Sequence, residues 1–301
     1  SREGAGPRRS RAGRSPPSPR ALRPARHAGT GRGVGAGLGT SVARVTELLV
    51  VGGGRMGEAL VGGLVRAGWA EPAAIAVVEP DPARREALAA AVPGVAVVEA
   101  PVAAAAAVLA VKPGLVAEVA AGLGSLGVGR VLSIAAGVRL ATIEAALPAG
   151  TAVVRAMPNT PALAGRGAAA IAPGAAADEE DLAWAEGVLG AVGIVVRVTE
   201  AQLDAVTGLS GSGPAYLFLV AEALADAGVR EGLPRPVAEA LAGQTVYGAG
   251  ALLAEGTPAA ELRAAVTSPG GTTAAGLHAL EAAAVRAAVA DAVRAATERS
   301  R

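Results

Sequence analysis

The sequence predicts an α/β fold, in which a parallel sheet with crossover helices is followed by an all-helical half. From residue 45, short β-branched runs alternate with Ala- and Leu-rich segments, a pattern typical of a parallel sheet. After about residue 200 the β-branched runs stop and helical patterns continue to the end. The 301 residues, 52% of them hydrophobic, are enough for two packed domains.

The expected elements follow from these patterns. We expect strands at 45–51, 74–79, 95–98, 107–111, 130–135, 151–154, 167–172 and 194–199. The helices of the first half are expected near 55–67, 82–91, 114–122, 139–147 and 178–192. Those of the second half are expected near 200–207, 213–227, 234–254, 258–266, 271–282 and 285–299. The sequence thus divides into a head at 1–43, a sheet domain at 44–200 and a helical domain at 201–301.

The head is rich in Arg, Gly, Pro and Ser and has no periodic apolar face, so we expect it to be disordered. Its nine arginines up to residue 40 would also suit an organelle transit peptide or a weak nucleic-acid patch, but we expect an irrelevant tail and no nucleic-acid partner. The absence of Cys fits a reducing cytosol, so we expect a cytoplasmic protein. The most apolar stretch, 91–111, is interrupted by Pro93, Glu99 and Pro101, so we expect no membrane span.

A glycine motif lies between the first expected strand and the first expected helix. Gly52, Gly54 and Gly57 form G-x-G-x-x-G at this βα turn. The first glycine allows a tight turn, the second lets a pyrophosphate approach, and the third lets helix and strand pack closely. The helix N-terminus adds N–H groups and positive potential. The motif therefore predicts a Rossmann-type dinucleotide site, although a Gly-rich turn in a Gly-rich protein would look similar.

The end of the second expected strand bears on the choice between NADH and NADPH. Glu79 stands where a carboxylate would accept hydrogen bonds from the ribose hydroxyls of NAD. Arg84 and Arg85, one turn into the next helix, could instead neutralise a 2′-phosphate, or could belong to a solvated helix face. These residues leave NADH and NADPH equally open.

Two side chains are single examples of their type. Lys112 is the only Lys and follows the expected strand that ends at 111, where ligands of parallel sheets bind. Its ammonium could meet a phosphate or a carboxamide, or could simply be exposed. Asn159 is the only Asn and lies between Pro158 and Pro161, which suits a positioned polar group or an ordinary turn.

The helical half contains a second segment suited to anions. Ser268-Pro269-Gly270-Gly271-Thr272-Thr273 leads into a helix, so its backbone N–H groups could hold a carboxylate, although an ordinary helix start would look the same. Earlier in this half, Ser210 and Ser212 precede a helix start at Pro214 and could cap it. With two His and no Cys, we expect no metal site. The helices at 213–227 and 234–254 are apolar on most of their circumference, so we expect a homodimer or a higher homo-oligomer.

Seven segments, in this order, resemble the pyrroline-5-carboxylate reductase family. They are VVGGGRMGEAL, LAVKPG, SIAAGV, VVRAMPNTPAL, LDAVTGLSGSGPAY, ADAGVREGLPR and VTSPGGTTAAGLHALE. The resemblance spans about 45–299, and the SPGGTT segment is its most specific part. It implies a Rossmann domain followed by a helical dimerisation domain, with an active site between one subunit's cofactor and its partner's helical domain.

The resemblance also implies roles for individual residues. The expected NADH- or NADPH-binding residues are Gly52, Gly54, Arg55, Met56, Gly57, Glu79, Val111, Lys112, Pro113, Ala136 and Asn159. The expected substrate-binding residues are Glu200, Ser268, Gly270, Gly271, Thr272 and Thr273, with Thr273 also in the catalytic role.

The implied activity is reduction of 1-pyrroline-5-carboxylate to L-proline, the last step of proline biosynthesis. One alternative is a β-hydroxyacid-type dehydrogenase, which needs a catalytic Lys in its helical half, where this chain has none. Another alternative is a non-catalytic NAD(P)-sensing module, which would not need the second anion-binding helix start.

Overall fold

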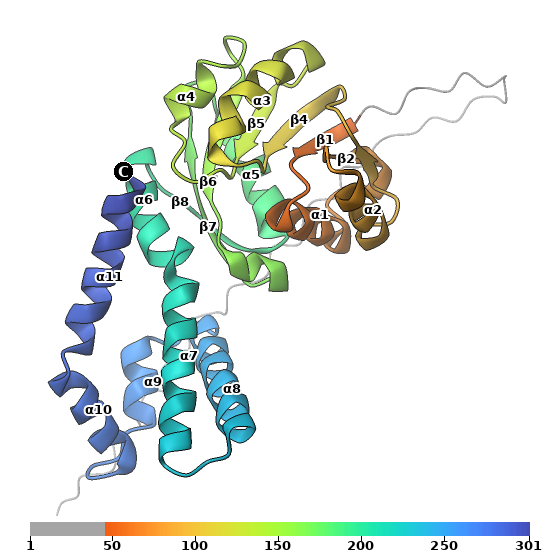
Figure 1. Ribbon diagram of the computed structural model, residues 1–301. Coiled ribbons are helices and arrows are strands. Elements are labelled where there is room, and N and C mark those ends of the chain that lie inside the picture. The colour runs from red at the N-terminus through yellow and green to blue at the C-terminus, as the bar shows by residue number, and fades with distance from the viewer. Residues whose placement is uncertain (1–45) are drawn as a thin grey trace, which may run out of the picture. The chain divides into compact units, whose positions relative to one another are not determined.

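The computed structural model describes residues 46–301, and the head at 1–43, which we expect to be disordered, lies outside the described residues. An eight-stranded sheet forms the first half, in the order β3-β2-β1-β4-β5-β6-β7-β8 (Figure 1). Its strands are β1 Thr46–Val51, β2 Ile75–Val78, β3 Ala96–Val98, β4 Ala104–Leu109, β5 Arg130–Ser133, β6 Ala152–Met157, β7 Gly167–Pro173 and β8 Gly193–Arg197. The β3 to β6 part has the strand order 3-2-1-4-5-6 of a dinucleotide-binding fold.

Helices cover both faces of this sheet, so its central strands are apolar on both sides. Along β1, Leu48 and Val50 enter one core and Leu49 and Val51 enter the other, because successive side chains of a strand point to opposite faces. The first core is completed by α1 Arg55–Ala67, α2 Pro82–Ala91 and α5 Glu179–Gly190. The second core is completed by α3 Val116–Leu123 and α4 Leu140–Glu144. The predicted α/β fold class is confirmed.

Two details of the sheet differ from the prediction. Strand β4 begins at Ala104 rather than at 107. Alanine has a weak strand propensity, but its small side chain fits between the helices that cover both faces at the centre of the sheet. Strand β7 runs antiparallel to β6. The segment 158–166 between them holds only a short 3-10 helix at Thr160–Ala164, and a parallel pair would need a longer crossover.

The second half is helical, as predicted. It consists of α6 Leu203–Val206, a π-helical turn at Thr207–Gly211, α7 Gly213–Arg230, α8 Arg235–Ala254, α9 Ala259–Ala265, α10 Thr272–Ala282 and α11 Val285–Ser300. Figure 1 shows α7 and α8 side by side. Ser212 precedes α7 but its side chain makes no capping bond, and the Ser210 hydroxyl donates to Val206 O instead, so the predicted serine cap is wrong. No helix from residue 46 onward has both the length and the apolar character needed to cross a membrane.

Candidate active site

The glycine motif forms a tight turn between β1 and α1, packed against the end of β4. Gly52 has a φ of +113°, which L side chains rarely adopt, and a Cβ there would lie 2.5 Å from Ala110 O. A Cβ on Gly57 would overlap the carbonyl oxygen of Gly52. In contrast, the space beside Gly54 is open, with no atom within 4 Å of a Cβ built there. The turn is therefore closed on its protein side and open in front of the α1 N-terminus.

Arg55 and Met56, the two residues inside the motif, have different surroundings. Arg55 is the first residue of α1 and is exposed, whereas Met56 is half-buried and packs against the core of the sheet. The structure thus leaves the Arg55 guanidinium accessible at the open side of the turn.

Glu79 follows β2 and contacts the glycine turn directly. Its Oε2 accepts a hydrogen bond from Gly53 N at 3.2 Å, and its Oε1 accepts one from Asp81 N at 3.0 Å. The Arg84 Nε donates to Gly53 O at 2.7 Å, and its guanidinium also pairs with Glu58 on α1. The turn is therefore held from two sides by side chains that follow β2.

Residues that follow β4 lie next to the glycine turn, and those that follow β5 lie one strand further along the same edge of the sheet. The backbone N–H of Ala110 donates to Val51 O at 2.8 Å, so the chain after β4 passes directly beside the turn. Lys112 is exposed there and precedes a short 3-10 helix, Pro113–Leu115. Ala136, in the loop after β5, is also exposed. The sheet therefore brings most of the predicted cofactor residues to one edge.

Asn159 is buried, with 8% of its surface exposed, and both ends of its amide are occupied. Its Oδ1 accepts from Ala168 N at 2.8 Å, and its Nδ2 donates to Ser210 O at 3.0 Å. The side chain thus ties the start of β7 to the π-helical turn. This arrangement gives the Asn159 side chain a positioning role.

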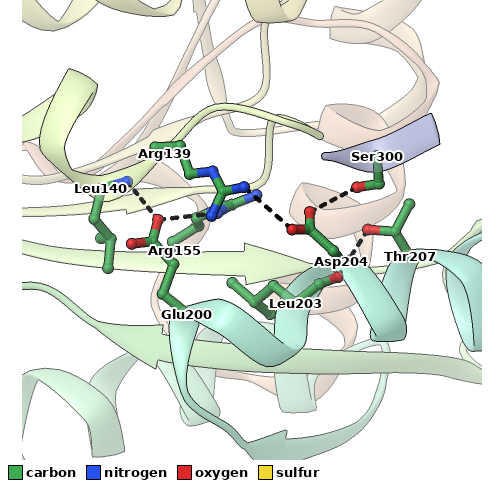
Figure 2. Close-up of polar contacts among 8 residues, drawn as sticks. All are labelled: Arg139, Leu140, Arg155, Glu200, Leu203, Asp204, Thr207 and Ser300. Carbon is green, nitrogen blue, oxygen red and sulfur yellow. Dashed lines mark hydrogen bonds and ion pairs between the residues drawn. The ribbon is translucent and has the colours of Figure 1, made fainter. Parts of the chain in front are cut away.

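Glu200 lies in a cluster of charges between the two halves of the chain (Figure 2). Its Oε1 accepts from Arg155 Nη1 at 2.9 Å and from Leu140 N at 2.7 Å. Next to this pair, Asp204 accepts from Arg139 Nη2 at 3.2 Å and from the hydroxyl of Ser300 at 2.9 Å.

The cluster joins segments that are far apart in the sequence. The side chain of Arg155 on β6 is only 4% exposed and that of Asp204 is 6% exposed, whereas that of Glu200 is 28% exposed. Among the described residues, no hydrogen bond reaches Glu200 Oε2, so this oxygen is free to accept one from a ligand. Glu200 was expected from the family resemblance, whereas its neighbours Arg155, Asp204, Arg139 and Ser300 were not predicted. The single Arg in the apolar run of β6 was the one signal for them.

The predicted substrate segment forms the start of α10. Gly271 N donates to Ser268 O at 3.1 Å, and Gly271 is the N-cap of the helix. Thr272 is exposed and Thr273 is half-buried. Figure 1 shows α10 well away from α1, so the fold of one chain does not bring this segment to the glycine turn.

Large apolar side chains are exposed on α7 and α8. On α7, Phe218 is 64% exposed and Leu219 is 66% exposed. On α8, Leu241 is 55% exposed and Tyr247 is 64% exposed. Exposed apolar patches of this kind mark interaction surfaces. They agree with the expectation that these helices bury a further face against another chain.

Two family models match the chain. The model described as pyrroline-5-carboxylate reductase dimerisation matches residues 200–301. The model described as NADP oxidoreductase, coenzyme F420-dependent, matches residues 47–137.

Similar proteins cover nearly the whole described part. A pyrroline-5-carboxylate reductase of Mycobacterium leprae is 44% identical over 287 residues, covering 87% of this chain and 97% of that protein. One of Synechocystis is 46% identical over 261 residues, covering 84% and 97%. A solved pyrroline-5-carboxylate reductase of Coxiella burnetii has a TM-score of 0.79 at 34% identity, covering 85% and 97%. A Plasmodium falciparum pyrroline carboxylate reductase with NADP bound has a TM-score of 0.72 at 28% identity, covering 85% and 97%.

Proposed function

The chain belongs to the pyrroline-5-carboxylate reductase family, and we propose on this basis that it reduces 1-pyrroline-5-carboxylate to L-proline with NAD(P)H, the last step of proline biosynthesis. The observation that carries the proposal is the extent of the similarity, which covers 97% of two relatives that bear this name. A β-hydroxyacid-type dehydrogenase is not favoured, because no Lys follows Lys112. A cytoplasmic location stays a prediction from the sequence.

The glycine turn fits a dinucleotide. The open space beside Gly54 lets a pyrophosphate approach the backbone, and the N–H groups at the start of α1 would hold it. We expect Arg55 and Lys112 to add positive charge at this edge, with Val111, Pro113 and Ala136 alongside. When bound, the cofactor supplies the hydride, and the residues of the chain position the substrate that receives it.

The start of α10 suits the carboxylate of the substrate. Backbone N–H groups from Gly270 to Thr273 would hold the carboxylate, as helix N-termini hold anions, with the Ser268 hydroxyl beside them. We expect the Thr273 hydroxyl to donate a hydrogen bond that orients the ring. A hydroxyl is a poor acid, so water or an already protonated imine supplies the proton of the product. The free Oε2 of Glu200 would stabilise the positive charge of the protonated imine.

The first prediction tests Thr273. Thr273→Ala should lower kcat/KM for pyrroline-5-carboxylate by about 10- to 100-fold, the effect of losing one hydrogen bond to a charged ligand. Affinity for NAD(P)H, measured by fluorescence titration, should stay normal. Thr273→Ser keeps the hydroxyl and should recover most of the activity. Unchanged turnover by Thr273→Ala would contradict the role of this residue, and cofactor binding without any turnover by the unaltered protein would favour the sensing module.

The second prediction tests the subunit interface. Because the start of α10 is far from the glycine turn of the same chain, we expect the site to need a second copy, held by the apolar faces of α7 and α8. Leu219→Glu should convert the oligomer to monomers, measured by light scattering, and abolish turnover. Ala90→Glu adds the same charge to an exposed position of α2 and should change neither. A fully active monomer would contradict the shared site.

A further inference from the structure

The side chains that follow β2 decide which cofactor the glycine turn accepts. In dinucleotide-binding folds, the residues at the end of this strand contact the adenosine ribose, where NADPH carries a 2′-phosphate and NADH a hydroxyl. Glu79 occupies this position and is fixed there by Gly53 N and Asp81 N. Each carboxylate oxygen has a second lone pair, so Glu79 can still accept hydrogen bonds from both ribose hydroxyls.

Arg84 is engaged within the protein and does not face this position freely. Its Nε donates to Gly53 O at 2.7 Å while its guanidinium pairs with Glu58, and its side chain is 30% exposed. The two contacts hold Arg84 across the glycine turn and its helix. Turning the guanidinium toward a phosphate on the ribose would break its contacts with Glu58 and Gly53 O.

Arg85 is engaged in a similar way. Its Nη1 donates to the carbonyl oxygens of Glu79 at 3.0 Å and Pro80 at 2.7 Å. Its Nη2 lies 3.6 Å from Glu99 Oε2. The guanidinium thus fixes the backbone behind Glu79 and is not directed to a ligand.

The charges around this position oppose an added phosphate. Arg84 and Arg85, the two guanidinium groups that follow β2, are already paired with the carboxylates of Glu58 and Glu99. A 2′-phosphate would therefore meet the Glu79 carboxylate at short range with no unpaired positive charge from these two arginines, and like charges repel most strongly where water is partly excluded.

We infer that this chain uses NADH in preference to NADPH, and that Glu79 is the residue that sets this preference. The inference rests on the proposed function only for the place where the dinucleotide binds. With this preference, the chain would differ from the solved Plasmodium falciparum relative, which has NADP bound. Arg84 then stiffens the glycine turn, and Arg85 fixes the backbone behind Glu79.

The test compares the two cofactors with and without the Glu79 carboxylate. For the unaltered protein, kcat/KM for NADH should exceed that for NADPH by at least about 10-fold at saturating pyrroline-5-carboxylate, because placing two like charges against each other in a binding site costs at least this much. Glu79→Ser should lower the ratio of kcat/KM for NADH to that for NADPH by 10-fold or more. Glu79→Gln serves as a second variant in case Glu79→Ser folds poorly. It keeps an acceptor for the backbone N–H groups and should also lower the ratio of kcat/KM for NADH to that for NADPH.

Glu86→Gln removes the same charge from an exposed position of α2 and is the matched control, which should leave the ratio unchanged. Equal or better use of NADPH by the unaltered protein, or an unchanged ratio in both Glu79 variants, would overturn the inference. Calorimetric titration with NAD+ and NADP+ measures the preference without the reaction. Tighter NAD+ binding in a protein without turnover would thus uphold this inference while rejecting the proposed function.

Discussion

Gly57→Ala is expected to weaken NAD(P)H binding by about 100-fold and to lower the free energy of unfolding by about 1–3 kcal/mol. A Cβ at this position would overlap the carbonyl oxygen of Gly52, which is backbone and cannot rotate away. Helix α1 would have to move away from β1, and the N–H groups at its start would move with it. Isothermal titration and urea unfolding measure the two effects.

A variant at Gly54, the second glycine of the motif, should weaken dinucleotide binding without disturbing the packing of α1. Gly54→Ala meets no atom within 4 Å, so its free energy of unfolding should stay within about 0.5 kcal/mol of the unaltered value. The new methyl group would, however, occupy the space that a pyrophosphate needs, so binding should weaken strongly. Gly122→Ala on α3 also meets no atom, so it should leave binding unchanged and raise the free energy of unfolding by up to about 1 kcal/mol, because alanine favours the helix more than glycine does. Normal binding by Gly54→Ala would show that the dinucleotide does not lie at this turn.

Glu200→Ala is expected to lower the free energy of unfolding by about 3–5 kcal/mol. The variant leaves the guanidinium of Arg155, with its side chain only 4% exposed, without its carboxylate. It also removes the acceptor of Leu140 N, the first N–H group of α4. Urea unfolding should show the loss, and a change below about 1 kcal/mol would contradict the structural role of the pair.

Two further variants distinguish the contribution of Glu200 to stability from its proposed contact with the substrate. Removing both partners, in Arg155→Met with Glu200→Ala, should recover much of the loss, because the unpaired charge is then absent. Glu200→Gln keeps an acceptor for Arg155 and should keep most of the stability. If Oε2 also stabilises the charged imine, Glu200→Gln should still lower kcat/KM for the substrate while affinity for NAD(P)H is unaltered.

Local patterns in the sequence were enough to predict most of the fold. The β-branched runs predicted the strands, and α1 and α2 were predicted with the bounds that the structure gives, 55–67 and 82–91. The start of β4 could not be predicted well, since alanine is common in helices and its place in the sheet depends on its neighbours. The reversal of β7 was predictable in principle, because the connection from β6 is too short for a crossover.

The candidate site could be predicted only where its residues are close together in the sequence or a fixed number of residues apart within one motif. The glycine turn and Glu79 belong to one βαβ unit, and the structure brings them into contact. The cluster around Glu200 and Asp204 joins residues from β6, α4 and α11 that no local pattern connects. Arg84 and Arg85 were expected to meet a 2′-phosphate or to lie on a solvated helix face, whereas both are engaged within the protein, with partners such as Glu58 and Glu99 that depend on the folded arrangement.

The strong bias of this chain toward arginine has a practical consequence at Lys112. This exposed residue carries the only side-chain amine in the sequence, and it follows the strand that runs beside the glycine turn. Reagents that acylate amines do not modify guanidinium groups, so side-chain labelling would be confined to this one position. A fluorophore attached there would sit beside the proposed dinucleotide pocket and could report its filling without any engineered cysteine.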